Sequence, residues 1–271
     1  MKLMNILLTK ILILLAVVSV STGAKAVEFD GLIEPHVIVK VGSGSPGILE
    51  TVDVDRGDFV KKGQVLATLQ AGVEKATLEV AQARAEMEAS IKAKDANRDF
   101  FRRKQQRHEE LYKNQALAFS QMDEVETNRI LAEMQLQEAL ENKRVAELEL
   151  KRASEVVKRL TIHSPIDGVV VERFLSPGEY VENQPVMKLA QIDPLNVEVV
   201  IAVKWFPSIK VGMQARVIPE APLGGVYPAE VKIVDRVIDA ASGTFGVRLE
   251  LPNPDHRLPA GLKCKVIFPR K

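Results

Sequence analysis

The sequence predicts an α+β protein: a β-sandwich built from two separated halves, a long antiparallel helical coiled-coil hairpin between the halves, and a small β-barrel after them. Residues 71–160 contain no proline and one glycine and are rich in Ala, Glu, Lys, Arg and Leu, which is typical of long helices. The flanking segments resemble each other at an offset of 121 residues, which superimposes Gly47 on Gly168, Gly57 on Gly178, Val60 on Val181 and Val65 on Val186. Short strands separated by turn residues after residue 192 predict the barrel.

Residues 1–26 have the pattern of a secretory signal peptide that is cleaved after Ala26. Two lysines precede the apolar run 11–20, and small residues follow it. An uncleaved N-terminal membrane anchor is the alternative, because residues 6–8 lengthen the apolar run. Removal of this segment leaves 34 basic and 36 acidic residues, a near balance that argues against a nucleic-acid partner. We expect the rest of the chain to be exported.

Residues 27–70 predict the first half of the β domain, and residues 161–191 predict the second half. In the first half, β-branched residues 37–41 and 48–54 read as strands on either side of the turn 43–47. Turns of this kind often need a positive φ angle, which glycine tolerates. We therefore expect a structural role for the glycines of the repeat and of the later turns: Gly47, Gly57, Gly168, Gly178, Gly212 and Gly261.

The helical stretch 71–160 must turn back on itself. A straight helix of this length would separate the two β halves by about 130 Å, at ~1.5 Å per residue, and neither half alone could bury a core. We expect the turn near residues 112–120, where charge density falls and Ser120 precedes Asp123 as a helix N-cap with an acid three residues later. The helices should then span residues 73–112 and 121–159.

The packing faces of the two helices are predicted from 4-3 spacing. In the second helix the line runs through Val125, Arg129, Ala132, Leu136, Ala139, Lys143, Ala146, Leu150, Ala153, Val157 and Leu160. In the first helix the corresponding line becomes polar toward the turn: Val73, Ala76, Val80, Ala83, Met87, Ser90, Lys94, Asn97 and Phe101. We expect the distal half of the hairpin to be the least stable region unless a partner covers it.

The barrel is expected over residues 192–271, with strands near 196–203, 214–218, 227–234, 246–251 and 263–268. Trp205 and Phe206 are interpreted as barrel core rather than as ligand contacts. Cys264 falls in a strand pattern and is expected to be a buried, unreactive thiol.

The residue types that carry chemistry are scattered. The histidines His36, His108, His163 and His256 show no metal-ligand spacing, and the methionines do not cluster. A constellation of nucleophile and base is also lacking. We therefore expect no catalytic residue, no cofactor and no metal site, and we do not expect an enzyme.

The ordered set of motifs resembles the periplasmic adaptor family, also called membrane fusion proteins, of HlyD-like or RND-efflux type. The motifs are the split β unit around the hairpin, followed by residues 192–194, 211–212, 252–256 and 258–261, and the resemblance covers nearly all of residues 27–271. It implies that the split β unit is a lipoyl-like (biotinyl-like) domain. It also implies a protein of the periplasm, associated with the inner membrane, that assembles into a ring and performs no catalysis.

The resemblance further implies two partners in a tripartite efflux or secretion system. One is an inner-membrane transporter, of RND type in preference to ABC type, and the other is a TolC-like outer-membrane channel. Family members that dock a channel carry Arg, Leu four residues later and Ser seven further on at the hairpin tip. Arg107 and Leu111 fit this spacing, whereas Ser120 lies nine residues after Leu111. We expect these three residues to bind a partner; a solvated helix face is the alternative for Arg107.

Two further expectations follow from the resemblance. Since the chain stops where the barrel should end, the membrane-proximal domain of the family is expected to be absent or vestigial. The alternatives to an adaptor are a coiled-coil envelope scaffold or tether without a transporter, and a swinging carrier with a modified lysine. The carrier is disfavoured because the hairpin occupies the place of the lysine-bearing turn. The exported substrate stays open.

Overall fold

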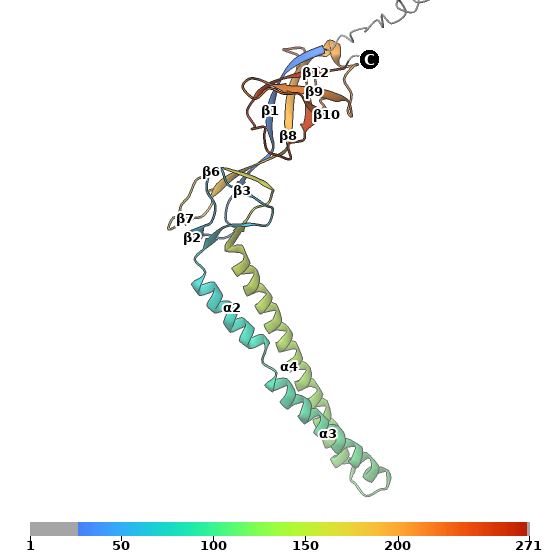
Figure 1. Ribbon diagram of the computed structural model, residues 1–271. Helices are drawn as coiled ribbons and strands as arrows, with labels where there is room; N and C mark the ends of the chain where they lie inside the picture. The colour runs from blue at the N-terminus through green and yellow to red at the C-terminus, as the bar shows by residue number, and fades with distance from the viewer. Residues whose placement is uncertain (1–26, 270–271) are drawn as a thin grey trace, which may run out of the picture. The chain divides into compact units, whose positions relative to one another are not determined.

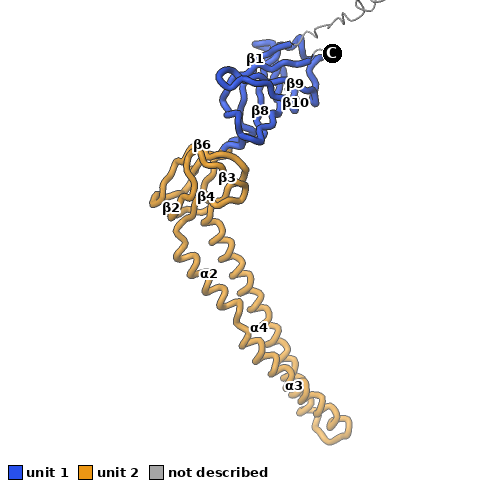
Figure 2. Tube along the Cα trace, in the orientation of Figure 1, with its two compact units in different colours: residues 1–38, 190–271 blue, residues 39–189 orange. Residues whose placement is uncertain are grey.

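The computed structural model describes residues 27–269 (Figure 1). The chain divides into two compact units, residues 39–189 and the residues before and after them (Figure 2). The long strands β1 (Val27–Val41) and β8 (Met187–Ala202) contribute to both units. The predicted signal peptide lies outside the described residues. Among the described residues, no helix combines the length and hydropathy needed to cross a bilayer.

In the unit of residues 39–189, the two segments flanking the helices form one β domain. The first segment supplies β2 (Gly47–Val52), β3 (Phe59–Val60) and β4 (Val65–Leu69). The second supplies β5 (Thr161–His163), β6 (Gly168–Arg173) and β7 (Tyr180–Val181). Strands from different segments pair as β2 with β7, β3 with β6 and β4 with β5, all antiparallel. The segments therefore close a shared core, which neither could build alone.

The pairing between the segments is reciprocal. The Gly57 amide donates to the carbonyl oxygen of Val170 at 2.9 Å, and the Gly178 amide donates to the carbonyl oxygen of Leu49 at 2.8 Å. Gly178 lies 121 residues after Gly57, and Leu49 lies 121 residues before Val170, so the two bonds are equivalent under the sequence repeat. The β domain thus has an approximate two-fold symmetry, which is the structural form of the sequence repeat.

The helical hairpin joins β4 to β5. It consists of α2 (Gly72–Ala85), α3 (Ala89–Lys113) and α4 (Phe119–Arg159), and Figure 1 shows α2 and α3 running beside α4. At its base the Leu69 amide donates to the Leu160 carbonyl oxygen at 2.8 Å, which holds the two ends of the hairpin together. The turn lies within the predicted residues 112–120.

Two predictions about where the helices begin and end are wrong. The first helix is not continuous, because Glu86–Glu88 interrupt it between α2 and α3. Ser120 is not an N-cap either: α4 begins at Phe119, its N-cap is Ala118, and no side chain caps it. Ser120 instead lies exposed in the first turn of α4.

The predicted packing face of the second helix is confirmed, since all eleven positions of its 4-3 line are buried or half-buried. The predicted face of the first helix is wrong near the base, where Val73, Ala76, Val80, Ala83, Met87 and Ser90 are exposed. The residues that pack there lie one or two positions later: Glu74, Leu78, Ala81 and Ala85. Beyond the interruption the predicted residues Lys94, Asn97 and Phe101 are half-buried, as expected.

The other unit is a closed β-barrel. Its strands are β1, β8, β9 (Gln214–Pro219), β10 (Tyr227–Val234), β11 (Thr244–Leu251) and β12 (Lys263–Phe268). They pair in the order β1-β12-β9-β10-β11-β8, and pairing of β1 with β8 closes the barrel. The short 3-10 helix η1 (Val203–Trp205) follows β8.

The start of β1 differs from the expected division of the chain. Residues 27–70 were assigned to the β domain, whereas residues 27–32 pair with β12 in the barrel. Without β1, the edges of β12 and β8 would present unpaired backbone groups. The barrel core is formed by inward residues of every strand, among them the buried Cys264, Val266 and Phe268 of β12. Trp205 is half-buried and packs against this core, as interpreted from the sequence, whereas Phe206 is exposed and that part of the interpretation is wrong.

Candidate partner-binding surfaces of the hairpin

The hairpin tip, residues 111–120, exposes apolar side chains. Phe119 is 69% exposed and Leu111 is 45% exposed. The rings of Tyr112 and Phe119 lie 6.4 Å apart between centroids, so the end of α3 and the start of α4 present a common aromatic surface. In the turn itself Gln115 has a positive φ of 59°, and its amide donates to the Tyr112 carbonyl oxygen at 2.9 Å. Burying exposed aromatic surface is a main source of binding energy at protein interfaces, so this tip is suited to contact a partner.

The three predicted tip residues are placed at or near this surface. Arg107 and Leu111 are exposed and lie one helical turn apart on α3, and Ser120 is exposed on α4. Within residues 27–269, the structure shows no hydrogen bond or ion pair of the Arg107 side chain, so its guanidinium is available to solvent. Sequence reasoning did not select Tyr112 and Phe119. The signal that could have found them is a pair of aromatic residues bracketing a predicted turn.

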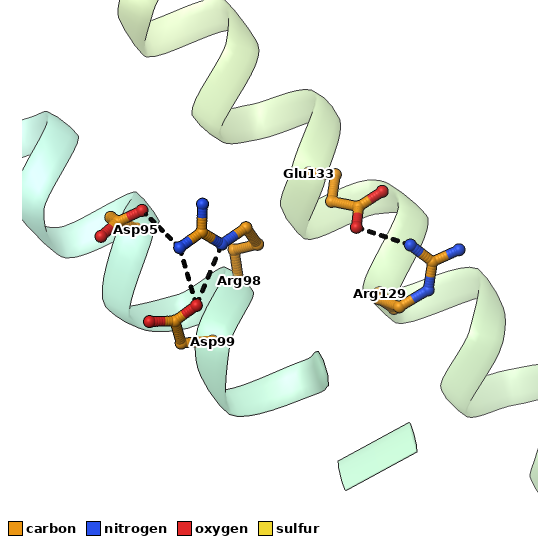
Figure 3. Close-up of polar contacts among 5 residues, drawn as sticks. All are labelled: Asp95, Arg98, Asp99, Arg129 and Glu133. Atoms are coloured by element: carbon orange, nitrogen blue, oxygen red, sulfur yellow. Dashed lines mark hydrogen bonds and ion pairs between the residues drawn. The ribbon is translucent and has the colours of Figure 1, made fainter. Parts of the chain in front are cut away.

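Below the tip, charged residues occupy the packed faces of α3 and α4 (Figure 3). Arg98 contacts Asp95 at 2.8 Å and Asp99 at 2.7 Å, while Arg129 contacts Glu133 at 2.5 Å. The hydrogen bond that Arg98 donates to Asp99 raises the pKa of Arg98 above its ordinary value, against the opposing effect of burial. The Nε of Arg129 is buried and has no hydrogen-bond partner among the described residues.

This polar layer confirms that the packing face becomes polar toward the tip. No residue of α3 is fully buried, whereas α2 and α4 bury alanine, valine and leucine residues. Apolar burial is the main source of helix-packing stability. The distal hairpin therefore combines the buried Val125, Ala132 and Leu136 of α4 with a polar face of α3, from which Lys94 contacts Gln135 at 3.1 Å.

Nearer the base, one face of the hairpin has an apolar groove between α2 and α4. The groove has a volume of about 550 Å³, and its apolar lining comprises Val73, Val80, Ala81, Ala153 and Val156. Charged residues of both signs border it, and two of them, Arg84 and Glu149, approach to 3.9 Å across the helices. A third helix could pack there, because alanines at the floor permit close approach.

Five of the six glycines proposed as structural meet a backbone or packing demand. Gly57, Gly178, Gly212 and Gly261 have φ angles of 94°, 90°, 85° and 94°. Gly47 has no room for a side chain, since an added Cβ would lie 2.9 Å from Leu69 Cδ2. Gly168 begins β6 opposite Val60, at the repeat position of Gly47.

The histidines form structural contacts rather than a cluster. His36 Nδ1 lies 3.2 Å from Asn196 Oδ1, His108 Nδ1 lies 3.0 Å from the Lys104 carbonyl oxygen, and His163 Nδ1 lies 3.0 Å from the Gly63 carbonyl oxygen. Among residues 27–269, no group of three or more His, Cys, Asp or Glu residues is arranged to hold a metal ion.

Comparison with known proteins identifies the family of this chain. Residues 36–191 match the model of the CzcB-like barrel-sandwich hybrid domain, and residues 197–271 match the model of the CusB-like β-barrel domain. Together these models account for most of the chain. The chain belongs to the membrane fusion protein, or periplasmic adaptor, family, whose members are generally non-catalytic.

Individual relatives are distant. The chain is 25% identical over 228 residues to the cobalt-zinc-cadmium resistance protein CzcB of Cupriavidus metallidurans. The aligned region covers 84% of this chain and 41% of CzcB. It is 23% identical over 234 residues to an uncharacterised protein of Haemophilus influenzae, covering 86% of this chain and 54% of that protein. The chain thus spans about half, or less, of these relatives.

Among solved structures, MacA of Actinobacillus actinomycetemcomitans has a similar fold. The TM-score is 0.76 at 24% identity, over 90% of this chain and 78% of that chain.

Proposed function

We propose that this chain is the periplasmic adaptor subunit of a tripartite efflux or secretion system. In this role it links an inner-membrane transporter, of RND type in preference to ABC type, to a TolC-like outer-membrane channel. It performs no catalysis and needs no cofactor. Its β domain, closed from two segments, corresponds to the lipoyl-like domain of the family, with the hairpin in place of the lysine-bearing turn. Family membership supports this role.

The observation that carries the proposal is the hairpin with its exposed aromatic tip. The hydrogen bond between Leu69 and Leu160 holds the start of α2 beside the end of α4. The hairpin therefore carries its tip away from the β domain. Leu111 and Phe119 there have no covering partner within residues 27–269. We assign channel contact to this tip, with Arg107 and Ser120 at its polar border.

Self-association into a ring is the second part of the proposal. The apolar groove between α2 and α4 offers a lateral face for a neighbouring copy, and its rim carries both acids and bases. The localisation that follows is the periplasm, in association with the inner membrane. Export through a signal peptide cleaved after Ala26 would deliver it there, with an uncleaved anchor as the alternative.

A gene-deletion experiment tests the role. The deletion strain should become sensitive to members of a panel of dyes, antibiotics and metal ions. The panel should include cobalt, zinc and cadmium, because CzcB is named for resistance to them. The wild-type chain should restore resistance, while Phe119→Ser should accumulate normally and fail to restore it. Phe100→Ser is the matched control, because Phe100 is an exposed aromatic of the hairpin shaft, away from the tip.

The alternative function is an envelope tether without a transporter. It predicts that deletion leaves sensitivity to every compound unchanged and that no inner-membrane transporter copurifies with the tagged chain. The adaptor role would be rejected if deletion changed no sensitivity, or if no transporter copurified and Phe119→Ser restored resistance as well as the wild-type chain.

A further inference from the structure

A second cavity lies in the barrel unit, where β1 begins and β12 ends. Its volume is about 370 Å³, within the range of roughly 300–1,000 Å³ that is usual for small-molecule sites. Three aromatic residues form its wall, since Phe29 packs edge-on against Trp205 at 6.1 Å and against Phe268 at 5.9 Å between ring centroids. Ile209 and Met213 add aliphatic surface.

The lining of this cavity carries one sign of charge. Among the described residues that line it, Lys210 is the ionisable one and none is acidic. The neighbouring Lys204 places its Nζ 6.0 Å from the centre of the Trp205 ring. Lys204 and Lys210 are both exposed, so their ammonium groups are accessible to a ligand from solvent.

The nearby acids are directed elsewhere. Side chains alternate between the faces of a strand, so Glu28 and Asp30 point away from the face that carries Val27 and Phe29. Both carboxylates contact Lys265 Nζ on β12, at 3.4 Å and 2.6 Å respectively. These two acids therefore pair with Lys265 and not with Lys210, which lines the cavity.

We propose that this cavity binds a single-chain amphiphile with an apolar tail and an anionic head group, such as a medium-chain carboxylate. The tail would contact the aromatic wall, and the head group would accept a charge-assisted hydrogen bond from Lys210. The volume of the cavity suits one hydrocarbon tail and not a whole phospholipid. This site is distinct from the hairpin surfaces and does not depend on the proposed transport role.

The chain contains a single tryptophan, Trp205, and it lines the cavity, which makes intrinsic fluorescence a local reporter. The full chain is titrated with ω-bromoundecanoate below its micelle concentration, since bromine quenches indole fluorescence on contact. We expect saturable quenching. The trimethylammonium analogue of the same chain length should quench much less, because its head group is repelled by the lysines.

Lys210→Glu tests the head-group contact, and as an exposed change it should not unfold the barrel. It should weaken carboxylate binding by about tenfold or more, which is the loss expected for one charge-assisted contact. Lys263→Glu is the matched control, because Lys263 is an exposed lysine at the opposite end of β12. It should leave the binding curve unchanged.

Three outcomes would overturn the proposal. The first is the absence of saturable quenching by the carboxylate. The second is equal quenching by the ammonium analogue, which would leave an apolar surface without charge selection. The third is quenching that appears only when lipid vesicles are added, which would assign the aromatic residues to a membrane surface instead.

Discussion

Gly57 and Gly178 illustrate how single residues hold the β domain together. They occupy the same place in the two copies of the repeat, and their φ angles are 94° and 90°. Each donates its amide hydrogen to a carbonyl oxygen of the other copy. A left-handed conformation is thus needed twice, at the two sites where one segment crosses to the other.

Replacing Gly178 with alanine should therefore lower the free energy of unfolding by about 1–2 kcal/mol, the cost of a side chain in this conformation. Lack of space is not the cause, since an added Cβ at Gly178 would meet nothing within 4 Å. Gly72→Ala is the control: Gly72 is also open but has no positive φ, and it starts α2. Urea unfolding of both variants measures the difference, and an equal effect of the two would contradict the conformational explanation.

Cys264 should behave as an unreactive thiol. Burial, with smaller contributions from Glu220 and Asp30, raises its pKa from 9.0 to about 11. At pH 8 the folded chain should react with a thiol reagent far more slowly than the chain unfolded in urea, because the thiolate is the reactive form. Since the folded pKa lies above the unfolded one, the contribution of this thiol to stability is present below pH 9 and is lost as the pH rises toward 11. Rapid labelling of the folded chain would contradict its burial.

At the scale of elements, the interruption of the first helix is a matter of phase. The packing residues of α2 are Glu74, Leu78, Ala81 and Ala85, and those of α3 are Ile91, Lys94, Arg98, Phe101, Gln105 and His108. Both sets follow 4-3 spacing, but the step from Ala85 to Ile91 is one residue shorter than a heptad. A continuous helix would turn the α3 set away from α4, which has an unbroken packing line.

This phase shift explains which part of the hairpin could be predicted. The single 4-3 line predicted for the first helix falls on half-buried residues of α3 from Lys94 onward and misses the packing residues of α2 by one or two positions. Residues 86–88 contain neither proline nor glycine, so no local signal marks the break. Its position depends on contacts with α4, which a one-dimensional pattern does not contain. The second helix was predictable because its own line is continuous.

Insertion of one alanine between Met87 and Glu88 should restore a full heptad and allow α2 and α3 to form one helix. We expect a higher helix content by circular dichroism and slower amide hydrogen exchange across residues 85–91. An alanine inserted after Ala96, inside α3, is the control and should destabilise the hairpin, because it turns Arg98 and Phe101 out of phase. Unchanged exchange at the break in the first variant would contradict the phase argument.

At the scale of the whole molecule, the repeat predicted that distant segments share a β domain, and the strand pairings show that they do. The barrel strands at residues 227–234 and 263–268 lie where turn spacing placed them. The role of residues 27–32 in the barrel could not be read from the sequence, because closure by the first strand is a long-range contact. At the tip, the motif spacing indicated Arg107, Leu111 and Ser120. The aromatic surface of Tyr112 and Phe119 was found only in the structure, because the folded turn brings the two rings together.

The central claim is that the hairpin tip and the barrel unit bind different partners. A photo-crosslinking amino acid placed at Phe119 in the tip, or at the exposed Val237 in the barrel unit, tests it in the native cell. We predict that position 119 captures an outer-membrane channel and that position 237 captures an inner-membrane transporter. Capture of the same protein from both positions, or of no envelope protein from position 119, would contradict the adaptor role.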